Sequence, residues 1–285
     1  RLARSMGEFT YEGYRLSYDE YGAGDRPIVL IHGLLMNRHM FERLGPILAE
    51  RGNRVIAPDL LGHGRSDRPE DLQRYSMPLF AYQVTALLDH LGIESAVIGG
   101  TSLGANVTLE AAVRFPERVQ ALFIEMPVLD NALSAVAAVF APIMIALRFG
   151  RPVFEAVSRA AAMLPRSHFL VDIGLDMVRQ RPGPSVSVLE GLLLGESSPR
   201  SAERCGIEQP ALIVGHPNDP LHPFSDAGML VGELANARQI DADSIFEWRL
   251  KPDRLNAELA DFLDDVWSQV EEERRPERKA RMAGA

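Results

Sequence analysis

The segment GTSLG, residues 100–104, has the residue types and the surroundings of a nucleophilic serine at Ser102. It follows the apolar run 96–98 and precedes a helical pattern over residues 105–115. A serine on a sharp strand-to-helix turn adopts strained dihedrals that flanking glycines tolerate, and its hydroxyl then stands clear of the sheet. The alternative interpretation is a tight turn whose serine caps the helix. The neighbouring strand and helix favour the nucleophile.

A second turn supplies groups that would stabilise negative charge. His32, Gly33 and Leu34 follow the apolar run 28–31. A glycine lets the backbone bend there, so that the next N–H points toward the serine. We expect the N–H groups of Leu34 and Leu103 to form an oxyanion hole, in which one donor is typically worth on the order of 3 kcal/mol. His32 is expected to hold this loop rather than to act as a base.

The elements that position these residues are short β-branched runs, most of them followed by a helical pattern. Strands that alternate with helices predict a parallel sheet covered on both faces. Residues 9–21 alternate and turn at Glu12-Gly13, which predicts an antiparallel hairpin at the sheet edge. A weak strand is predicted over 237–242 and a final helix over 254–270. The other predicted strands are residues 28–31, 54–57, 95–98, 121–125 and 211–214.

Between residues 127 and 209 the strand signal disappears, and apolar helical patterns are interrupted by glycines and prolines. This predicts a helical cap inserted into one α/β core that comprises residues 7–126 and 210–270. The most apolar stretch, 132–147, falls short of the roughly 20 residues of a spanning helix, so we expect a buried or lid helix and no membrane span. Residues 271–285 lack apolar periodicity and are predicted to be a disordered charged tail.

Composition excludes several classes of function. Acidic residues outnumber basic ones by 39 to 30, and this net charge of -9 disfavours nucleic acid as a partner. Only Lys251 and Lys279 are lysines, which leaves few candidates for a Schiff base. The single cysteine, Cys205, cannot form an internal disulfide, and residues 1–10 do not resemble a signal peptide. We therefore expect a reducing, cytoplasmic location, and the sequence implies no cofactor.

Together these motifs resemble the α/β-hydrolase superfamily, in particular its cap-bearing serine esterase and lipase-like members. The resemblance covers residues 7–269 and includes the His-Gly turn, the loop DLLGHGRS at residues 59–66, the serine elbow and the late segment GHPND at 215–219. It implies a mostly parallel eight-stranded sheet flanked by helices, a helical cap, and Asp219 as the acid that orients a catalytic histidine. Serine at the elbow argues against haloalkane dehalogenases and epoxide hydrolases, which use a carboxylate nucleophile. The loop at 59–66 is expected to be fixed by its aspartate and glycine turns.

One loop departs from the family pattern. Family members usually carry the general base after the last strand, but that loop contains no histidine here, and Ser244 occupies the aligned position. His222, three residues after Asp219, is our candidate base, against the alternative that it contacts the cap or solvent. His168 in the cap is a further candidate. General-base assistance is typically worth about 10²- to 10⁴-fold, so the departure bears directly on activity.

Other residues near these motifs have alternative interpretations. Glu125 and Asp130, after the middle strand, are acid positions used by some family members. His216, Asp219 and His222 form an H-x-x-D-x-x-H string, but prolines between them prevent the helix that would align such ligands, so we expect no metal site.

The cap contains more apolar residues than a solvated helix pair needs, and a cap over the strand ends usually roofs the pocket of an open α/β sheet. We therefore expect a hydrophobic small-molecule substrate. The arginines Arg148, Arg151 and Arg159 either meet a carboxylate of the substrate or are solvated.

The main hypothesis is a serine hydrolase that acts on an ester, thioester or lactone through an atypical or weakened triad. The alternatives are a hydrolase-like binding protein without hydrolytic activity, and a non-hydrolytic lyase or cyclase with the same pocket. The oligomeric state is left open.

Overall fold

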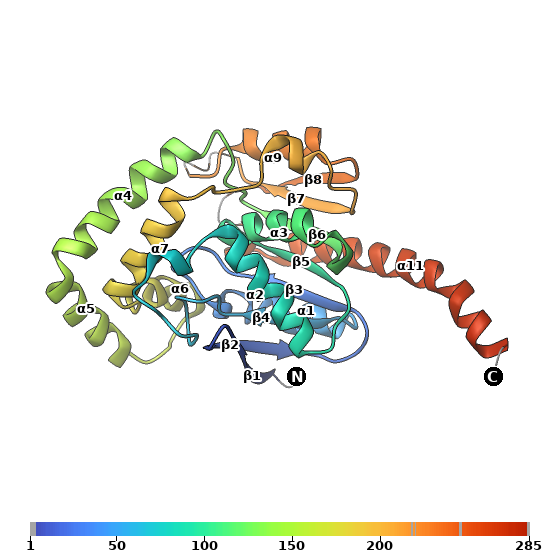
Figure 1. Ribbon diagram of the computed structural model, residues 1–285, viewed down its shortest axis with the longest axis horizontal. Coiled ribbons are helices and arrows are strands. Elements are labelled where there is room, and N and C mark those ends of the chain that lie inside the picture. The colour runs from blue at the N-terminus through green and yellow to red at the C-terminus, as the bar shows by residue number, and fades with distance from the viewer. Residues whose placement is uncertain (1–3, 218, 220, 245–246, 284–285) are drawn as a thin grey trace.

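The computed structural model describes residues 4–217, 219, 221–244 and 247–283, and the side chains of 274–283 are not considered. The described chain forms one sheet of eight strands with helices on both faces (Figure 1). The strands are β1 (Arg4–Tyr11), β2 (Tyr14–Tyr21), β3 (Pro27–Ile31), β4 (Arg54–Pro58), β5 (Ala96–Thr101), β6 (Val119–Glu125), β7 (Ala211–Gly215) and β8 (Ala237–Asp241).

The strand order is β1-β2-β4-β3-β5-β6-β7-β8. Strand β2 pairs antiparallel with β1 and with β4, and the remaining neighbours pair parallel. The predicted mostly parallel eight-stranded sheet is therefore confirmed. The hairpin turn is also where the pattern put it: Glu12 and Gly13 have φ of 49° and 83°, the left-handed pair that suits a two-residue turn.

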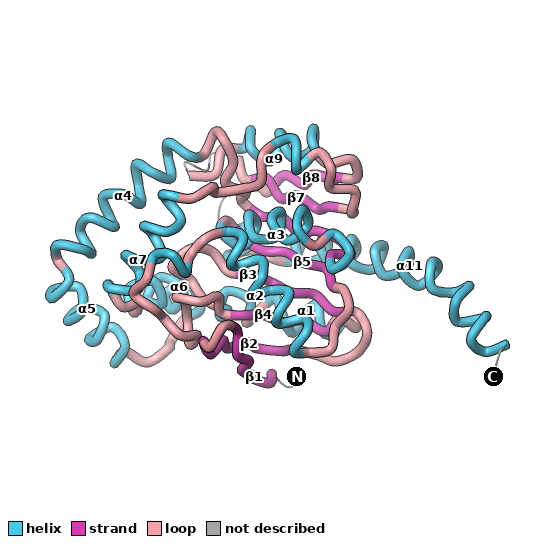
Figure 2. Tube along the Cα trace, in the orientation of Figure 1, coloured by secondary structure: helices cyan, strands magenta, loops and turns pink. Residues whose placement is uncertain are grey.

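Helices occupy every long connection of this sheet, as Figure 2 shows. The α-helices are α1 (Leu44–Glu50), α2 (Met77–His90), α3 (Leu103–Arg114), α4 (Leu133–Phe149), α5 (Arg151–Met163), α6 (Phe169–Val178), α7 (Pro182–Leu194), α8 (Ser201–Arg204), α9 (Phe224–Glu233), α10 (Glu247–Leu250) and α11 (Asp253–Ala283). Three short 3₁₀ helices are η1 (Arg38–Phe41), η2 (Leu72–Arg74) and η3 (Pro116–Arg118).

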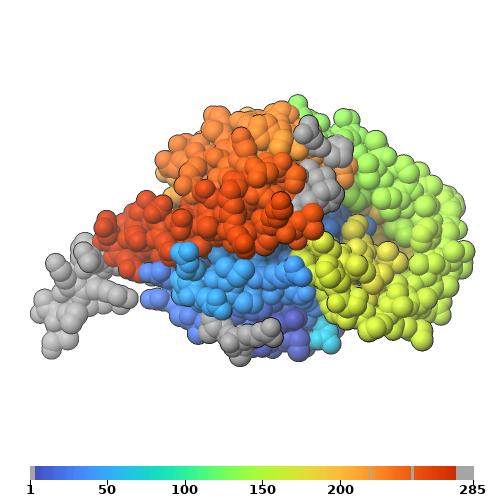
Figure 3. Space-filling model, turned by 180° about the vertical axis from the view of Figure 1, so that it is seen from behind, coloured from blue at the N-terminus to red at the C-terminus, as the bar shows by residue number. Residues whose placement is uncertain are grey.

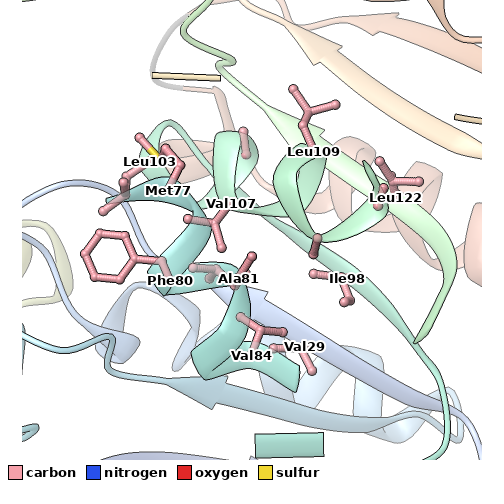
Figure 4. Close-up of a cluster of buried hydrophobic side chains, with 14 of the residues drawn as sticks. Val29, Met77, Phe80, Ala81, Val84, Ile98, Leu103, Val107, Leu109 and Leu122 are labelled. Carbon is pink, nitrogen blue, oxygen red and sulfur yellow. The ribbon is translucent and has the colours of Figure 1, made fainter. Parts of the chain in front are cut away.

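Two apolar cores hold the layers together. On one face of the sheet, side chains of α2, α3 and α9 pack against β3, β5 and β6. Figure 4 shows part of this core, in which Phe80 and Val84 of α2 lie beside Val107 of α3 and Ile98 of β5. On the other face, α1 and α11 pack against the same strands. Helix α3, which begins directly after Ser102, is thus held by a core on its buried side.

The loop at residues 59–66 is fixed by its aspartate, as predicted. The Asp59 carboxylate accepts hydrogen bonds from the backbone N–H groups of Arg38 and Arg65, both at 2.8 Å, and pairs with the Arg38 guanidinium. Gly64 has φ of 52°, and a Cβ there would lie 2.1 Å from the Asp59 carboxylate, so only glycine fits. The loop therefore closes around one buried carboxylate.

Helices α4, α5, α6 and α7 follow β6 in the chain and stand beyond one end of the sheet (Figure 1). Of the two expectations for residues 132–147, a buried or a lid helix, the first is wrong, because α4 has no buried residue. It packs against α5 and α7 rather than the sheet, so one side of the helix faces inward and the other faces outward. Among the described residues no single helix is long and apolar enough to cross a membrane, whereas α4 and α5 together reach that length and composition with a bend of 97°.

The last helix differs from its predicted boundary. Helix α11 continues to Ala283 instead of ending near residue 270, and it projects beyond the body of the molecule (Figure 1). The prediction of a disordered tail over 271–285 is therefore wrong for the part up to residue 283, while 284–285 lie outside the described residues. Residues 271–283 are rich in glutamate, arginine and alanine, which are strong helix formers, so a helix already begun continues without an apolar stripe.

Candidate active site

Ser102 lies between β5 and α3 in the strained conformation that the elbow motif predicts. Its φ and ψ are 55° and -109°. The turn is tight enough that a Cβ on Gly104 would lie 2.0 Å from the carbonyl oxygen of Ile31, and one on Gly100 would lie 2.4 Å from the same atom. The Ser102 N–H donates to the carbonyl of Glu125 at 2.9 Å, which holds the elbow to β6. The two glycines therefore allow the turn that presents the serine.

His222 reaches the serine from the loop after β7. The Ser102 hydroxyl donates to Nε2 of His222 over 2.9 Å, and Nδ1–H of His222 donates to Oδ2 of Asp219, also over 2.9 Å. The other oxygen of Asp219 accepts from the backbone N–H groups of Leu221 and His222 at 2.8 and 3.1 Å. The three candidate side chains are thus brought together in one hydrogen-bonded line, and His222 faces the serine rather than solvent.

Asp219 is ionised in this arrangement and can therefore accept the hydrogen bond from His222. Burial favours the neutral acid, but the hydrogen bond and the charge interaction with His222 outweigh it and lower the pKa of Asp219 below its usual value of 3.8. An ionised carboxylate only accepts hydrogen bonds, so it keeps the proton of His222 on Nδ1 and leaves Nε2 free to accept the serine proton.

The loop after β3 places a second set of groups beside Ser102. A Cβ on Gly33 would lie 3.9 Å from Cβ of Ser102, so the backbone passes close to the nucleophile. Among the described residues, the N–H groups of Leu34 and Leu103 have no protein acceptor, and both residues line the cavity in front of the serine. The N–H of Leu103 is one of the unpaired donors at the start of a helix. Both N–H groups are therefore available to an acceptor bound in the cavity.

His32 holds this loop, as expected. Its ring is fully buried, its Nε2 accepts from the Leu60 N–H at 3.1 Å, and its Nδ1–H donates to the carbonyl of Gly33 at 2.9 Å. Burial lowers its pKa below 6.5, so the ring is neutral at pH 7. His32 therefore ties the 59–66 loop to the turn that carries the Leu34 N–H.

The cavity in front of Ser102 has a volume of about 1100 Å³ and a mainly apolar lining. Core residues such as Met40 and Met77 form one side. The helices that follow β6 form the opposite side, so a substrate that fills the cavity would contact both parts of the chain. Lining side chains from those helices are Leu133, Val136, Ala137, Phe140, Leu170, Ile173, Met177, Leu189, Leu192 and Leu193.

Comparison with known proteins agrees with this architecture. A family model described as the alpha/beta hydrolase fold matches residues 26–155, which include the 59–66 loop and the serine elbow. An enol-lactonase from Burkholderia xenovorans superposes with a TM-score of 0.73 at 22% identity, covering 90% of this chain and 100% of that one. These likenesses show that the chain has the α/β-hydrolase fold.

Relatives at higher identity match only part of this chain. An uncharacterized protein of Mycobacterium tuberculosis is 41% identical over 115 residues, and the match spans 40% of this chain and 33% of that protein. A 2-hydroxymuconate semialdehyde hydrolase from a Pseudomonas species is 37% identical over 117 residues, which are 40% of this chain and 41% of the relative. The chain therefore covers about a third of the length of the curated relatives it matches first.

Behind the serine, an ion cluster surrounds the buried Glu125, which the sequence offered only as an alternative acid. Glu125 accepts a hydrogen bond from the Thr101 hydroxyl and pairs with His216 and Arg249, each over 3.2 Å. Burial raises the pKa of Glu125, but Arg249 and His216 outweigh it and lower the pKa to about 2. Glu125 is therefore committed to this cluster and does not serve as the acid partner of His222. No sequence signal identified Arg249, which is 124 residues away.

The remaining candidates make no described contact with the serine. Asp130 lines the same cavity, but its side chain is 68% exposed and lies 3.8 Å from Arg204. His168 precedes α6, is exposed and is absent from the described lining of the cavity. Ser244 is exposed, and its carbonyl lies 3.2 Å from Nδ1 of His216. These residues do not replace His222 as the partner of Ser102.

The three arginines at the tip of the insertion bind carboxylates of the protein itself. Arg148 pairs with Glu190, and Arg151 pairs with Glu70 and Glu155. Arg159 lies 4.0 Å from Glu155. None of these arginines is among the described lining residues of the cavity, so they are not placed to meet the carboxylate of a substrate there.

Proposed function

We propose that this chain is a serine hydrolase that cleaves the carboxylic ester, thioester or lactone bond of a hydrophobic small molecule. The observation that carries the proposal is the 2.9 Å contact between Ser102 Oγ and His222 Nε2 at a strained elbow that opens into an apolar cavity. Ser102 is the nucleophile, His222 the general base, and Asp219 orients the histidine. We also propose that residues 127–209 act as a cap that forms the far wall of the site.

In the first half-reaction, Ser102 Oγ attacks the carbonyl carbon while Nε2 of His222 takes the hydroxyl proton. Negative charge develops on the carbonyl oxygen, and the N–H groups of Leu34 and Leu103 donate to it. The charged imidazole then gives its proton to the leaving oxygen or sulfur as that bond breaks. Asp219 stabilises the imidazolium through its hydrogen bond to Nδ1. The acyl group remains bound to Ser102.

In the second half-reaction, water takes the place of the leaving group, and His222 removes one of its protons. The resulting hydroxide attacks the acyl carbon, the oxyanion is held by the same two N–H groups, and the proton returns to Ser102 as the carboxylic acid leaves. In this mechanism the base and its orienting acid both come from the β7–α9 loop, three residues apart. A triad of this kind needs no histidine after β8.

The class of substrate follows from the lining and agrees with the names of similar proteins. An apolar cavity of about 1100 Å³ accepts a lipophilic acyl chain or ring, and it offers few charged groups to anchor a strongly polar molecule. The enol-lactonase and the 2-hydroxymuconate semialdehyde hydrolase are both named for hydrolysis of small organic molecules. A serine at the elbow also favours an acyl intermediate over the alkyl intermediate that a carboxylate nucleophile forms.

Covalent labelling tests the proposal directly. The purified protein should react with a fluorophosphonate at Ser102, detected by mass spectrometry of the labelled peptide, and should cleave short p-nitrophenyl esters. Ser102→Ala should remove both reactions. His222→Ala should slow ester cleavage by about 10²- to 10⁴-fold, because it removes the general base. Asp219→Asn should slow cleavage by a comparable factor, because the amide can donate to Nδ1 and leave the histidine proton on Nε2, which then cannot accept the serine proton.

Ser244→His provides the matched control, since it puts a histidine at the usual family position. With His222 already bonded to the serine, this variant should leave the rate within about twofold of the parent. If Ser102→Ala were as active as the parent, the lyase or cyclase alternative would replace our proposal. Absence of both labelling and ester cleavage, together with tight binding of a lipophilic ester, would instead identify a binding protein.

A further inference from the structure

Helix α4 presents apolar side chains to the outside of the molecule. Residues 131–147 contain no charged residue, and none of the α4 side chains is buried. A helix that is apolar on all sides is normally buried in a protein core or in lipid. Neither the sheet nor the other described helices cover the outer side of α4, so a water-exposed apolar surface is left.

The exposed apolar surface of α4 continues onto α5. We define the apolar edge as Val139, Ile145 and Phe149 of α4 with Val153 and Val157 of α5, which are 40, 52, 81, 66 and 45% exposed. These helices form the outer margin of the molecule, opposite the end from which α11 projects (Figures 1 and 3). Five large apolar side chains on one convex margin are more than scattered surface residues require.

The same helix also lines the cavity. Leu133, Val136 and Phe140 recur at helical spacing and face the cavity in front of Ser102. At 3.6 residues per turn, Ile145 and Phe149 lie on the far side of α4 from those residues. One helix thus separates the apolar cavity from the apolar edge, so a lipophilic molecule held at the edge is one helix width from the site.

The charge around the edge differs from that of the rest of the chain. Residues 131–170 contain four arginines and one glutamate, a net charge of +3, whereas the remaining residues carry -12. Arg148 and Arg151 pair with Glu190 and Glu70, which brings this region close to neutral. The edge is therefore the part of an acidic protein that approaches lipid phosphates without repulsion, with arginine stems beside the apolar side chains.

We infer that the apolar edge binds the surface of a phospholipid bilayer. A convex margin across a 97° bend fits a deformable lipid surface, whereas pairing with a second copy needs a self-complementary patch. The helices lie in the interface with their apolar side chains among the acyl chains and do not span the bilayer. This inference rests on the proposed function. If the edge lies in the bilayer, the substrates are esters dissolved in the membrane, and they reach Ser102 by passing α4.

Vesicle flotation tests the surface without requiring catalysis. Parent protein and Ser102→Ala should both float with phosphatidylcholine vesicles, and binding should persist at about 0.5 M salt because apolar burial drives it. The double variant Phe149→Glu with Val153→Glu should lose flotation by about tenfold or more. Its matched control, Met6→Glu with Val231→Glu, changes two exposed apolar residues on β1 and α9 and should float like the parent.

Further readouts separate the two proposals. The Phe149→Glu/Val153→Glu variant should cleave a soluble p-nitrophenyl ester at the parent rate but lose activity on vesicle-embedded p-nitrophenyl palmitate. If parent protein does not float, or if the double variant floats like the parent, the lipid surface is refuted. A parent dimer by light scattering that the double variant converts to monomer, without vesicle binding, would assign the edge to a second copy instead. Flotation of Ser102→Ala with no ester cleavage by the parent would refute the proposed hydrolase and leave the surface standing.

Discussion

Two acidic side chains near Ser102 have different partners and therefore different roles. Asp219 bonds to a histidine that touches the serine, whereas Glu125 is enclosed by Arg249 and His216 behind the elbow. Because the carbonyl of Glu125 also accepts from the Ser102 N–H, the buried cluster supports the strained residue from below. In the proposed mechanism Asp219 orients the general base, whereas Glu125 stabilises the turn that carries Ser102.

The Glu125 cluster predicts how stability changes with pH. The pKa of Glu125 is lowered from 4.5 to about 2 in the fold, so its contribution is present above about pH 4.5 and is lost as the pH falls toward 2. The pKa of His216 is raised above 6.5: burial lowers it, but the Glu125 carboxylate outweighs that effect. The contribution of His216 is therefore present below pH 6.5 and is lost as the pH rises through its folded value.

We expect Glu125→Gln to reduce the free energy of unfolding at pH 6 by about 1 to 3 kcal/mol, because the buried His216 and the partly exposed Arg249 lose their anion. The variant should also lose much of the acid dependence between pH 4.5 and 2 in urea unfolding. Asp89→Asn is the control, since its side chain is 66% exposed and its ion pair with Arg118 is worth less than about 1 kcal/mol. If the two substitutions changed the free energy of unfolding equally, the Glu125 cluster would not be a special source of stability.

At the scale of elements, one side chain of α3 joins both ends of the inserted helices to the core. Nδ2 of Asn106 donates to the carbonyls of Val128 and Ser197 at 2.7 and 2.6 Å, and its Oδ1 accepts from the Val128 N–H at 3.0 Å. Asp226 of α9 adds a second tie, since its carboxylate accepts from the N–H groups of Leu129 and Ala132. The entry and exit of the insertion are thus fastened directly beside the serine elbow.

Asn106→Ala should loosen the insertion without unfolding the sheet. It removes three hydrogen bonds to backbone groups, and each group left unsatisfied costs about 1 to 3 kcal/mol, unless water reaches it. We expect faster amide exchange over residues 128–132 and 195–200, measured by hydrogen-exchange mass spectrometry, with exchange in β5 and β6 unchanged. Asn236→Ala, whose Nδ2 bonds to Glu208 on the exposed surface, is the control. Uniform acceleration across the sheet would argue against a local clasp.

At the scale of the whole molecule, the two ends of the long axis are formed by different parts of the chain. The inserted helices lie at one end and α11 projects at the other (Figure 1). Among the residues of α11 whose side chains the structure describes, the buried ones precede residue 270, and Trp267 donates to Asn53 of the core at 2.9 Å. The stability of the fold therefore depends on the first half of α11.

A chain that ends at residue 273 should keep its free energy of unfolding within about 1 kcal/mol, because every described side chain that α11 contributes to a core precedes residue 271. A chain that ends at residue 258 should fail to fold. It loses Leu259, Leu263 and Trp267, each worth about 1.5 to 3 kcal/mol of burial, along with other core residues, against a typical total of about 5 to 15 kcal/mol. Thermal unfolding followed by circular dichroism distinguishes these outcomes. A large loss of stability in the chain that ends at residue 273 would show that residues 274–285 support the fold.

Local chemistry was enough to predict much of this architecture. The hairpin at Glu12-Gly13, the parallel strands and the elbow at Ser102 depend on residues that are neighbours in the chain, so period, glycine position and turn type predict them. Asp219 was indicated by the resemblance to the superfamily, in which an aspartate after a late strand orients the catalytic histidine. The end of α11 was misjudged because the absence of an apolar stripe does not prevent strong helix formers from extending a helix.

What the sequence determined by itself, then, is the order of the strands along the chain, the turn that presents Ser102 and the residue types available to activate it. The direction of the His222 ring was decided only by the tertiary structure, because it depends on how the β7–α9 loop lies against the elbow 120 residues earlier. Tertiary structure also decided the Glu125 pairing with Arg249 and the exposure of α4. Pairings between distant residues, and the side of an apolar helix that is left uncovered, follow from packing and not from local pattern.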